Sequence, residues 1–266
     1  MKTLLFTAAE VTLIVLGAVN AAQAEILTVP SNLSSIEGNA NNVSPFSIVG
    51  RNQQVFAASE FAFLSKPALI TKISFRTDAS FVSGRPPSLP FSSEIPDIQI
   101  ALSTTNAAVD RLSGTFANNI GSDETIVYRG ALSLSSAFTS PATGPKPFDV
   151  SINLQNPFLY DPSLGNLLLD VKNFSNDGVA FLALDAQDEI GDSISRRFTN
   201  NVNSPTAFDD SFANSLGLVA QFTITPIPKP VPESSSILGL SIIGFTALIT
   251  KKKLASSKSV SFIRKK

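Results

Sequence analysis

Alternation of apolar and polar residues with a period of two dominates the middle of this 266-residue chain. In residues 97–104, Ile98, Ile100 and Leu102 alternate with polar or small residues, as they do in a strand that buries one face. Similar alternation is clear in 69–77, 148–154 and 216–225, and weaker in 53–57, 125–135, 167–174, 179–185 and 194–199. We therefore predict about nine strands.

Local signals add detail to this pattern. In residues 69–77 we expect Leu69 to face the core and Arg76 to lie on the opposite face. Gly178 follows Asn176 and Asp177 between two apolar runs, which predicts a hairpin turn. Residues 106–116 have apolar residues at helical spacing, which fits one turn or a short helix. Four prolines in residues 78–96 predict a long surface loop. Residues 32–47 are rich in Asn and Ser, which indicates a mobile lead-in.

Together these elements predict an all-β domain over residues 25–225. One-sided apolar strands favour two packed antiparallel sheets, a jelly-roll-like or immunoglobulin-like sandwich, although the pattern does not fix the topology. The chain has no cysteine, so packing rather than disulfides must stabilise the domain. Of its 20 phenylalanines, 17 lie between residues 25 and 228, which suits a large apolar core.

The N-terminus has the pattern of a secretory signal peptide over residues 1–24. Lys2 precedes the apolar residues 11–19, and Ala22 and Ala24 supply the small-residue cleavage site for signal peptidase. Cleavage would leave Glu25 as the new N-terminus. The alternative is a buried N-terminal helix of the domain.

The C-terminus combines a Pro/Ser-rich linker, residues 226–236, with the uncharged apolar run 237–250 and the basic tail 251–266. As a helix the run is about 21 Å long, short of the ~30 Å hydrocarbon core. Snorkelling of Lys251, Lys252 and Lys253 and local membrane thinning would close the gap. We predict a single transmembrane helix; a buried core helix is the alternative.

Charge is divided between the body and the tail. Residues 25–228 carry 11 Lys and Arg against 19 Asp and Glu, whereas residues 229–266 carry 8 Lys and Arg and only Glu233. Because positively charged flanks of a membrane segment stay in the cytoplasm, we expect the basic tail on the cytoplasmic side and the acidic body outside the inner membrane. An acidic body also argues against nucleic acid as a partner.

Val231, Pro232 and Glu233 precede the apolar run and the lysines, and this three-part tail resembles the PEP-CTERM sorting signal. In that family a Pro-Glu-Pro motif, a short transmembrane helix and an Arg-rich end direct processing by an exosortase. Here Ser234 replaces the second proline, lysines replace the arginines, and 13 further residues follow the basic cluster.

The body is similar to a recurrent type of PEP-CTERM protein. The similarity is carried by residues 51–59, 116–124, 158–171 and 191–196. The similarity implies export and association with exopolysaccharide and extracellular matrix. It does not imply a particular reaction.

Candidate chemistry is sparse. The chain has no histidine and no cysteine, which excludes His-based triads, Cys nucleophiles and His or Cys zinc sites. Adjacent carboxylates remain for a hydrolase, namely Asp123/Glu124, Asp188/Glu189 and Asp209/Asp210. Neighbours in a strand face opposite ways, so a charged loop is the simpler interpretation and we predict no enzyme.

The richest set of oxygen ligands is Asp185, Asp188, Glu189 and Asp192. Calcium suits such oxygens, but Ile190 stands where the EF-hand requires glycine, and a charged loop is favoured over a metal site. We therefore predict no cofactor. Without Trp, and with only Tyr128 and Tyr160, sugar recognition would have to come from polar loops.

The sequence thus predicts an exported, membrane-anchored and then surface- or matrix-associated protein with a structural or adhesive role. Signal peptidase, an exosortase-like enzyme, the inner membrane and exopolysaccharide are the expected partners. The alternative is a calcium-assisted carbohydrate-binding module.

Overall fold

Twelve strands form three antiparallel sheets in the part of the chain that the computed structural model describes, residues 23–43, 45–79, 90–138, 144–175, 183–208 and 215–227. The first sheet has the order β1 (Glu25–Val29), β12 (Ala220–Pro226), β4 (Ala68–Phe75) and β7 (Val150–Tyr160). The second has the order β10 (Ile194–Thr199), β3 (Gly50–Phe56), β8 (Asn166–Asn173), β5 (Phe91–Thr105) and β6 (Thr125–Ser136). The third comprises β11 (Leu216–Leu218), β9 (Leu184–Asp188) and β2 (Ala40–Asn42). The predicted all-β class is confirmed.

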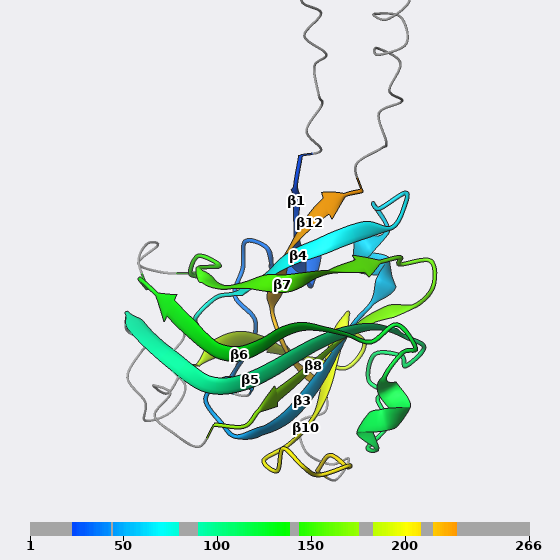
Figure 1. The fold of residues 1–266 in the computed structure, drawn as a ribbon. Helices are drawn as coiled ribbons and strands as arrows, with labels where there is room; N and C mark the ends of the chain where they lie inside the picture. Colours follow the sequence, from blue (N-terminus) through cyan, green and yellow to red (C-terminus); the bar gives the residue numbers. More distant parts are fainter. Residues whose placement is uncertain are drawn as a thin grey trace, which may run out of the picture. The chain divides into compact units, whose positions relative to one another are not determined.

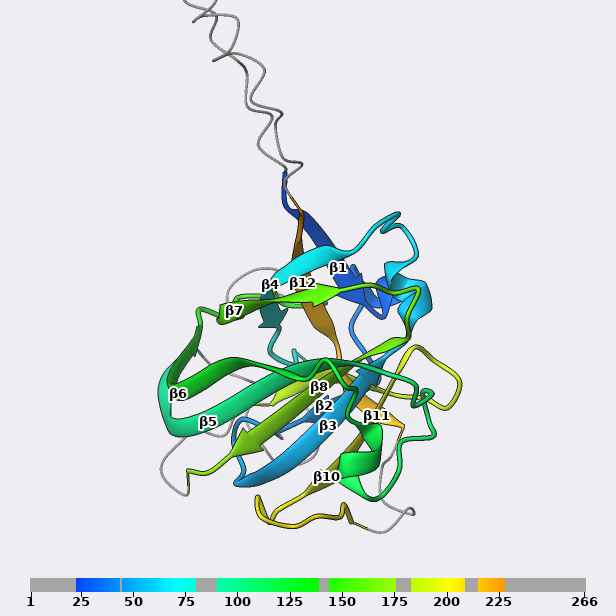
Figure 2. The same ribbon diagram turned by 45° about the vertical axis from the view of Figure 1, so that its right-hand side comes forward.

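The four-stranded and five-stranded sheets lie one above the other, with the core between them (Figures 1 and 2). Phenylalanine dominates this core. The ring of Phe222 on β12 packs edge-on to Phe56 on β3 at 5.0 Å, and Phe61 bridges Phe222 and Tyr160. Phe61 belongs to the short 3-10 helix η2 (Ala58–Phe61). The apolar alternation of the sequence therefore fills a sandwich-like interior.

Several predictions concern residues outside the described part. They are the segment 1–22, including Ala22, the turn at Gly178, and everything from residue 228 onward. The sorting motif Val231, Pro232 and Glu233, the apolar run 237–250 and the lysines Lys251, Lys252 and Lys253 thus stay predictions. Within the described residues, no helix is both long and apolar enough to span a membrane.

Two of the predicted strands differ from expectation in burial or limits. A register shift between Ile70 and Lys72 moves Ile70, not Leu69, into the core. Arg76, which we expected on the opposite face to the core, is only 1% exposed. The strand predicted over 216–225 is two strands, because the chain changes sheets at Val219 between β11 and β12.

Two segments predicted to be irregular contain strands. β5 begins at Phe91, inside the predicted proline-rich loop, and Pro96 lies in a bulge of its pairing with β6. Since the β8 ladder reaches only to Ile98, the missing N–H of Pro96 interrupts no bond there. The predicted lead-in 32–47 holds part of η1 (Ser31–Leu33), all of β2 and the buried ring of Phe46.

Residues 106–116, where the spacing fits one turn or a short helix, contain a turn in which Arg111 N donates to the carbonyl of Ala108 at 3.1 Å. That segment is irregular, and a short 3-10 helix, η3 (Phe116–Asn119), follows it. Its apolar residues still serve packing, because Leu112 joins Val55 and Leu168 in a small second cluster on the outer face of the five-stranded sheet. The helical spacing of the apolar residues therefore indicated a loop that packs against the sheet.

A buried ion pair fixes the corner where the first and third sheets meet. Arg76, just after β4, binds Asp185 on β9 with 2.6 Å from Nε to Oδ2. Arg76 Nη2 also donates to the carbonyls of Leu33 and Ile36, at 2.9 and 2.6 Å, and Gly38 N donates to Asp185 Oδ1 at 2.9 Å. One pair thereby holds β4, β9 and residues 33–38 together.

We predict that Arg76→Met lowers the free energy of unfolding by about 3–5 kcal/mol, because Asp185 would remain as an unpaired buried charge. The double variant Arg76→Met/Asp185→Asn removes both charges and should recover part of the loss. Urea unfolding followed by far-UV circular dichroism measures both. As a matched control, Arg129→Met breaks the half-exposed pair with Asp97 and should cost about 1 kcal/mol or less. Equal losses for Arg76→Met and Arg129→Met would contradict the role assigned to the buried pair.

Candidate functional site

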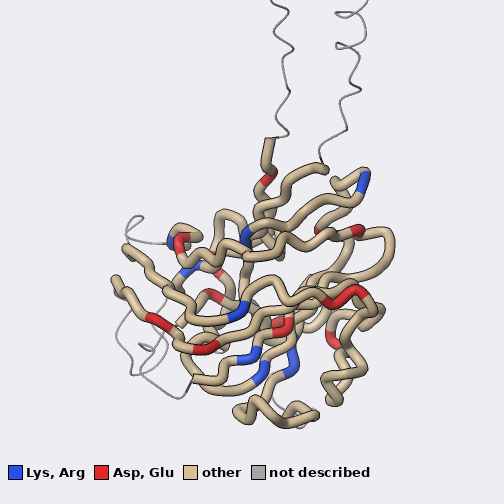
Figure 3. Tube along the Cα trace, in the orientation of Figure 1, with Lys and Arg blue, Asp and Glu red and all other residues tan. Residues whose placement is uncertain are grey.

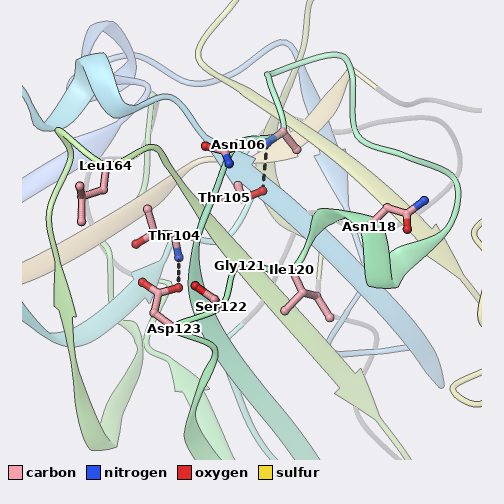
Figure 4. Close-up of a pocket in the computed structure, with 10 residues that line it drawn as sticks. Thr104, Thr105, Asn106, Asn118, Ile120, Gly121, Ser122, Asp123 and Leu164 are labelled. Carbon is pink, nitrogen blue, oxygen red and sulfur yellow. Dashed lines mark hydrogen bonds between the residues drawn. The ribbon is translucent and has the colours of Figure 1, made fainter.

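A hollow of about 460 Å³ lies where β5 ends. Three segments line it: the end of β5 with the residues after it, the stretch that follows η3, and the β7–β8 turn (Figure 4). The lining residues are Thr104, Thr105, Asn106, Ala107, Asn118, Ile120, Gly121, Ser122, Asp123 and Leu164. A hollow of this size is large enough for a small organic ligand.

Short-range hydrogen bonds fix the walls of the hollow. The backbone N–H of Thr104 donates to Asp123 Oδ1 at 2.7 Å, and Gly121 N donates to Ser103 Oγ at 3.2 Å. Gly121 lies so close to β5 that a Cβ there would be 1.7 Å from the carbonyl oxygen of Thr104. Glycine is therefore required for this contact.

A polar network holds the segment around η3 to the outer face of the five-stranded sheet. Arg51 Nε and Nη2 bind the two carboxylate oxygens of Asp170 at 3.0 and 2.5 Å. Gln53 Nε2 donates to Asp170 and to the carbonyl of Phe116, and Asn119 Nδ2 donates to Gln53 Oε1 at 2.9 Å. The guanidinium of Arg51 also lies 4.6 Å from the centre of the Phe116 ring. Because every member is bonded, the network fixes one wall of the hollow.

The chemistry of the lining is mainly that of neutral hydrogen-bonding groups. Hydroxyls and amides come from Thr104, Asn106, Asn118 and Ser122, and Asp123 contributes a carboxylate. Apolar surface comes from Ala107, Ile120 and the 68% exposed Leu164. Such a site can bind and orient a ligand through hydrogen bonds.

The four candidate calcium ligands, for which we favoured a charged loop, lie in or beside the β9–β10 connection and have different partners. Asp185 is bound to Arg76 inside the fold, and Asp188 Oδ1 accepts a hydrogen bond from Ser215. Glu189 accepts from Gln187, and Asp192 Oδ1 accepts from the backbone N–H of Ile194. Among the described residues, no three acidic side chains form a group that could hold a metal ion. The calcium-assisted alternative stays a prediction.

Asp192 faces a second carboxylate that sequence inspection did not single out. Asp110 Oδ2 accepts the N–H of Gly191 at 2.8 Å, and Asp110 has the left-handed backbone φ of 60°. Burial raises the pKa of Asp192 to about 6, and the negative charges of Asp110, Glu189 and Asp188 add to the rise. The N–H of Ile194 opposes it only in part.

Of the adjacent carboxylate pairs, only Asp123 of Asp123/Glu124 lines the hollow, and Asp209/Asp210 lies outside the described residues. Sequence inspection did not identify the other lining residues as a site. The signal that was available is the concentration of Asn, Gly, Ser and Asp in residues 118–123, which is typical of a polar loop.

Comparison of the chain with models of known families, with curated proteins and with solved structures gave no match.

We predict that Gly121→Ala destabilises the protein by about 1–3 kcal/mol, because the new methyl group would force the Thr104 carbonyl and residues 120–123 apart. Thermal unfolding measures the effect. Gly114→Ala is the matched control, since a Cβ at Gly114 meets nothing within 4 Å. A Gly121→Ala variant as stable as Gly114→Ala would show that the close contact with β5 is absent.

A second prediction concerns pH. Because the folded-state pKa of Asp192 lies above its ordinary value of 3.8, this group favours folding most below pH 3.8, and that contribution is lost as the pH rises through 6. Asp192→Asn keeps the acceptor for Ile194 and should raise the free energy of unfolding by about 1 kcal/mol at pH 7.5, allowing for partial solvent screening. Near pH 4 the gain should disappear. Urea titrations at both pH values test this, and a gain independent of pH would refute the assignment.

Proposed function

We propose that this protein is exported, is held in the inner membrane by its C-terminal segment, and then acts as a structural or adhesive component of the cell surface or matrix. The observation that carries the proposal is the pairing of β1 with β12, which joins Glu25 to Ile224. The folded body thus begins directly after the predicted cleavage site at Ala24 and closes where the predicted linker starts at 226.

This arrangement also places the two ends of the body together. β1 begins and β12 ends at the same end of the four-stranded sheet, at the top of Figure 1. A body whose ends meet at one edge can be tethered there without disturbing its remaining surface. That supports a role in which the body is displayed and the termini serve transport.

We infer further that the body is a jelly roll. Without β2, β9, β10 and β11, the remaining eight strands have the orders β1-β12-β4-β7 and β3-β8-β5-β6. Numbered 1 to 8 along the chain, these are 1-8-3-6 and 2-7-4-5, the order of a jelly roll built from two Greek keys. The immunoglobulin order, 1-2-5-4 and 3-6-7, differs. The other four strands are then additions to this frame.

A binding role, not a catalytic one, fits the available side chains best. With no histidine or cysteine in the chain, acid–base chemistry would rest on carboxylates, Lys or Tyr, and none of the described lining residues is Lys or Tyr. In the hollow Asp123 is the only carboxylate among the described lining residues, whereas glycoside hydrolysis uses two. Signal peptidase and an exosortase-like enzyme are the proposed processing partners, and exopolysaccharide is the proposed matrix partner.

The processing proposal predicts that Pro232→Ala/Glu233→Ala leaves a membrane-bound precursor in the native host. The expected reason is loss of the residues that an exosortase-like enzyme would recognise. Intact-mass measurement of the protein from membrane and surface fractions tests this. Wild type should reach the surface with Glu25 as its first residue and without residues 237–266.

Pro228→Ala is the matched control, because it changes a proline of the same linker outside the motif. It should be processed like wild type. Identical masses for the wild type and the Pro232→Ala/Glu233→Ala variant would remove the exosortase interpretation, and full-length wild type in the cytosol would remove export altogether.

A further inference from the structure

We propose that the hollow at the end of β5 is a binding site for an uncharged saccharide, with Asn106, Ser122 and Asp123 bonding its hydroxyl groups. The proposal deepens the matrix role and rests on it, because a displayed protein would meet such ligands at the surface. It names a site that the sequence alone did not reveal, and it narrows the ligand to uncharged saccharides.

The polar groups of the hollow are suited to hydroxyl ligands. The side chains of Asn106 and Ser122 are exposed and are not hydrogen-bonded to any described residue, so they keep their donors and acceptors for a ligand. Asp123 Oδ1 is used by Thr104 N, while Oδ2 accepts no hydrogen bond from the described part of the chain. Amides and carboxylates can each pair with two neighbouring hydroxyls, which is the pattern that a sugar ring presents.

Apolar surface beside these groups completes the chemistry. Leu164 in the β7–β8 turn is 68% exposed, and Ile120 is partly buried against the cluster formed by Val55, Leu112 and Leu168. A sugar ring has C–H groups as well as hydroxyls, and its C–H face can cover such aliphatic side chains. Because aliphatic side chains cover the C–H face, the proposed sugar binding does not need an aromatic ring and is compatible with a chain that has no tryptophan.

Charge selects against an acidic ligand. None of the described lining residues is Lys or Arg, and Asp123 is negative. Elsewhere in the described part, positive and negative residues are distributed over the molecule without forming one basic face (Figure 3). A uronate or a sugar phosphate would therefore meet an uncompensated carboxylate in the hollow, whereas a neutral sugar would not.

The site is largely formed before any ligand arrives. Asp123 bonds Thr104, Gly121 contacts β5, and the network from Arg51 to Asn119 fixes the segment around η3. Ordering costs on binding are correspondingly small. In Figure 1, η3 lies at the lower right, away from the top where β1 begins and β12 ends. The 3-10 helix that lines the hollow thus lies away from the start of β1 and the end of β12.

The test uses the full chain purified in lauryldimethylamine oxide, a detergent without a sugar group. Glucose, galactose, mannose and their β-linked disaccharides are titrated calorimetrically, with glucuronate and glucose 6-phosphate as charged counterparts. At least one neutral sugar should bind, and hydrogen–deuterium exchange should slow within residues 104–107 and 118–123. The charged counterpart of that sugar should bind at least about tenfold more weakly.

Variants locate the site. Asn106→Ala and Ser122→Ala change exposed side chains, so they should fold normally and weaken binding of the neutral sugar about fivefold to tenfold each. Asp123→Asn retains an acceptor for Thr104 and should reduce the preference over the charged sugar. Asn200→Ala, at an exposed asparagine that does not line the hollow, is the matched control and should bind like wild type.

No binding of any neutral sugar, protection in other segments, or unchanged affinity in Asn106→Ala and Ser122→Ala would overturn the proposal. Stronger binding of the charged sugars would overturn the assignment of ligand class. These failures leave the surface location untouched, because fractionation and intact mass decide that separately.

Discussion

The buried pair of Arg76 and Asp185 is the interaction on which the arrangement of the sheets depends. Both side chains are almost fully buried, and the backbones of the same residues are bonded, with Asp185 N donating to Arg76 O at 3.0 Å. Val219 N, at the bend between β11 and β12, donates to Asp185 O at 3.0 Å. One corner therefore joins the end of β4, the small third sheet and the strand that changes sheets. Burying two charges is expensive, and the geometry offsets the cost because the guanidinium and both carboxylate oxygens are bonded.

A second polar network shapes the surface. In an isolated sandwich the outer face of β8 would face water, yet Leu168 and Asp170 are buried beneath the segment that runs from residue 106 to η3. Asp170 binds Arg51 and Gln53, and Gln53 in turn holds Asn119. The loop is attached to the sheet by polar bonds at its far end and by Leu112 near its middle. The hollow exists because this attached loop and the β7–β8 turn both stand above the end of β5.

The sequence allowed the strands to be predicted better than their partners. Period-two alternation located β5 around Ile98, Ile100 and Leu102, all at most 1% exposed, and the limits of β10 agree with prediction. β1 and β2 were missed because five and three residues give too little alternation to detect. The burial of Arg76 was not foreseen because its partner lies 109 residues away, and local pattern carries no information about such pairing. The hollow was missed for the same reason: Thr104, Ser122 and Leu164 come from segments that only the fold brings together.

Because the chain has no cysteine, hydrogen bonds and ion pairs between residues far apart in the sequence become more important. Many domains tie remote segments together with disulfides, but this chain has no cysteine to form one. Side chains take that place: Arg51 reaches Asp170, Gln54 exchanges two 2.8 Å bonds with the backbone of Leu218, and Asn173 donates to the carbonyls of Pro45 and Phe46. Unlike a disulfide, such a bond does nothing to restrict the unfolded chain, so its whole contribution is made in the folded state. The phenylalanine core therefore supplies most of the driving force for folding, and the buried polar pairs favour one register and one set of loop positions.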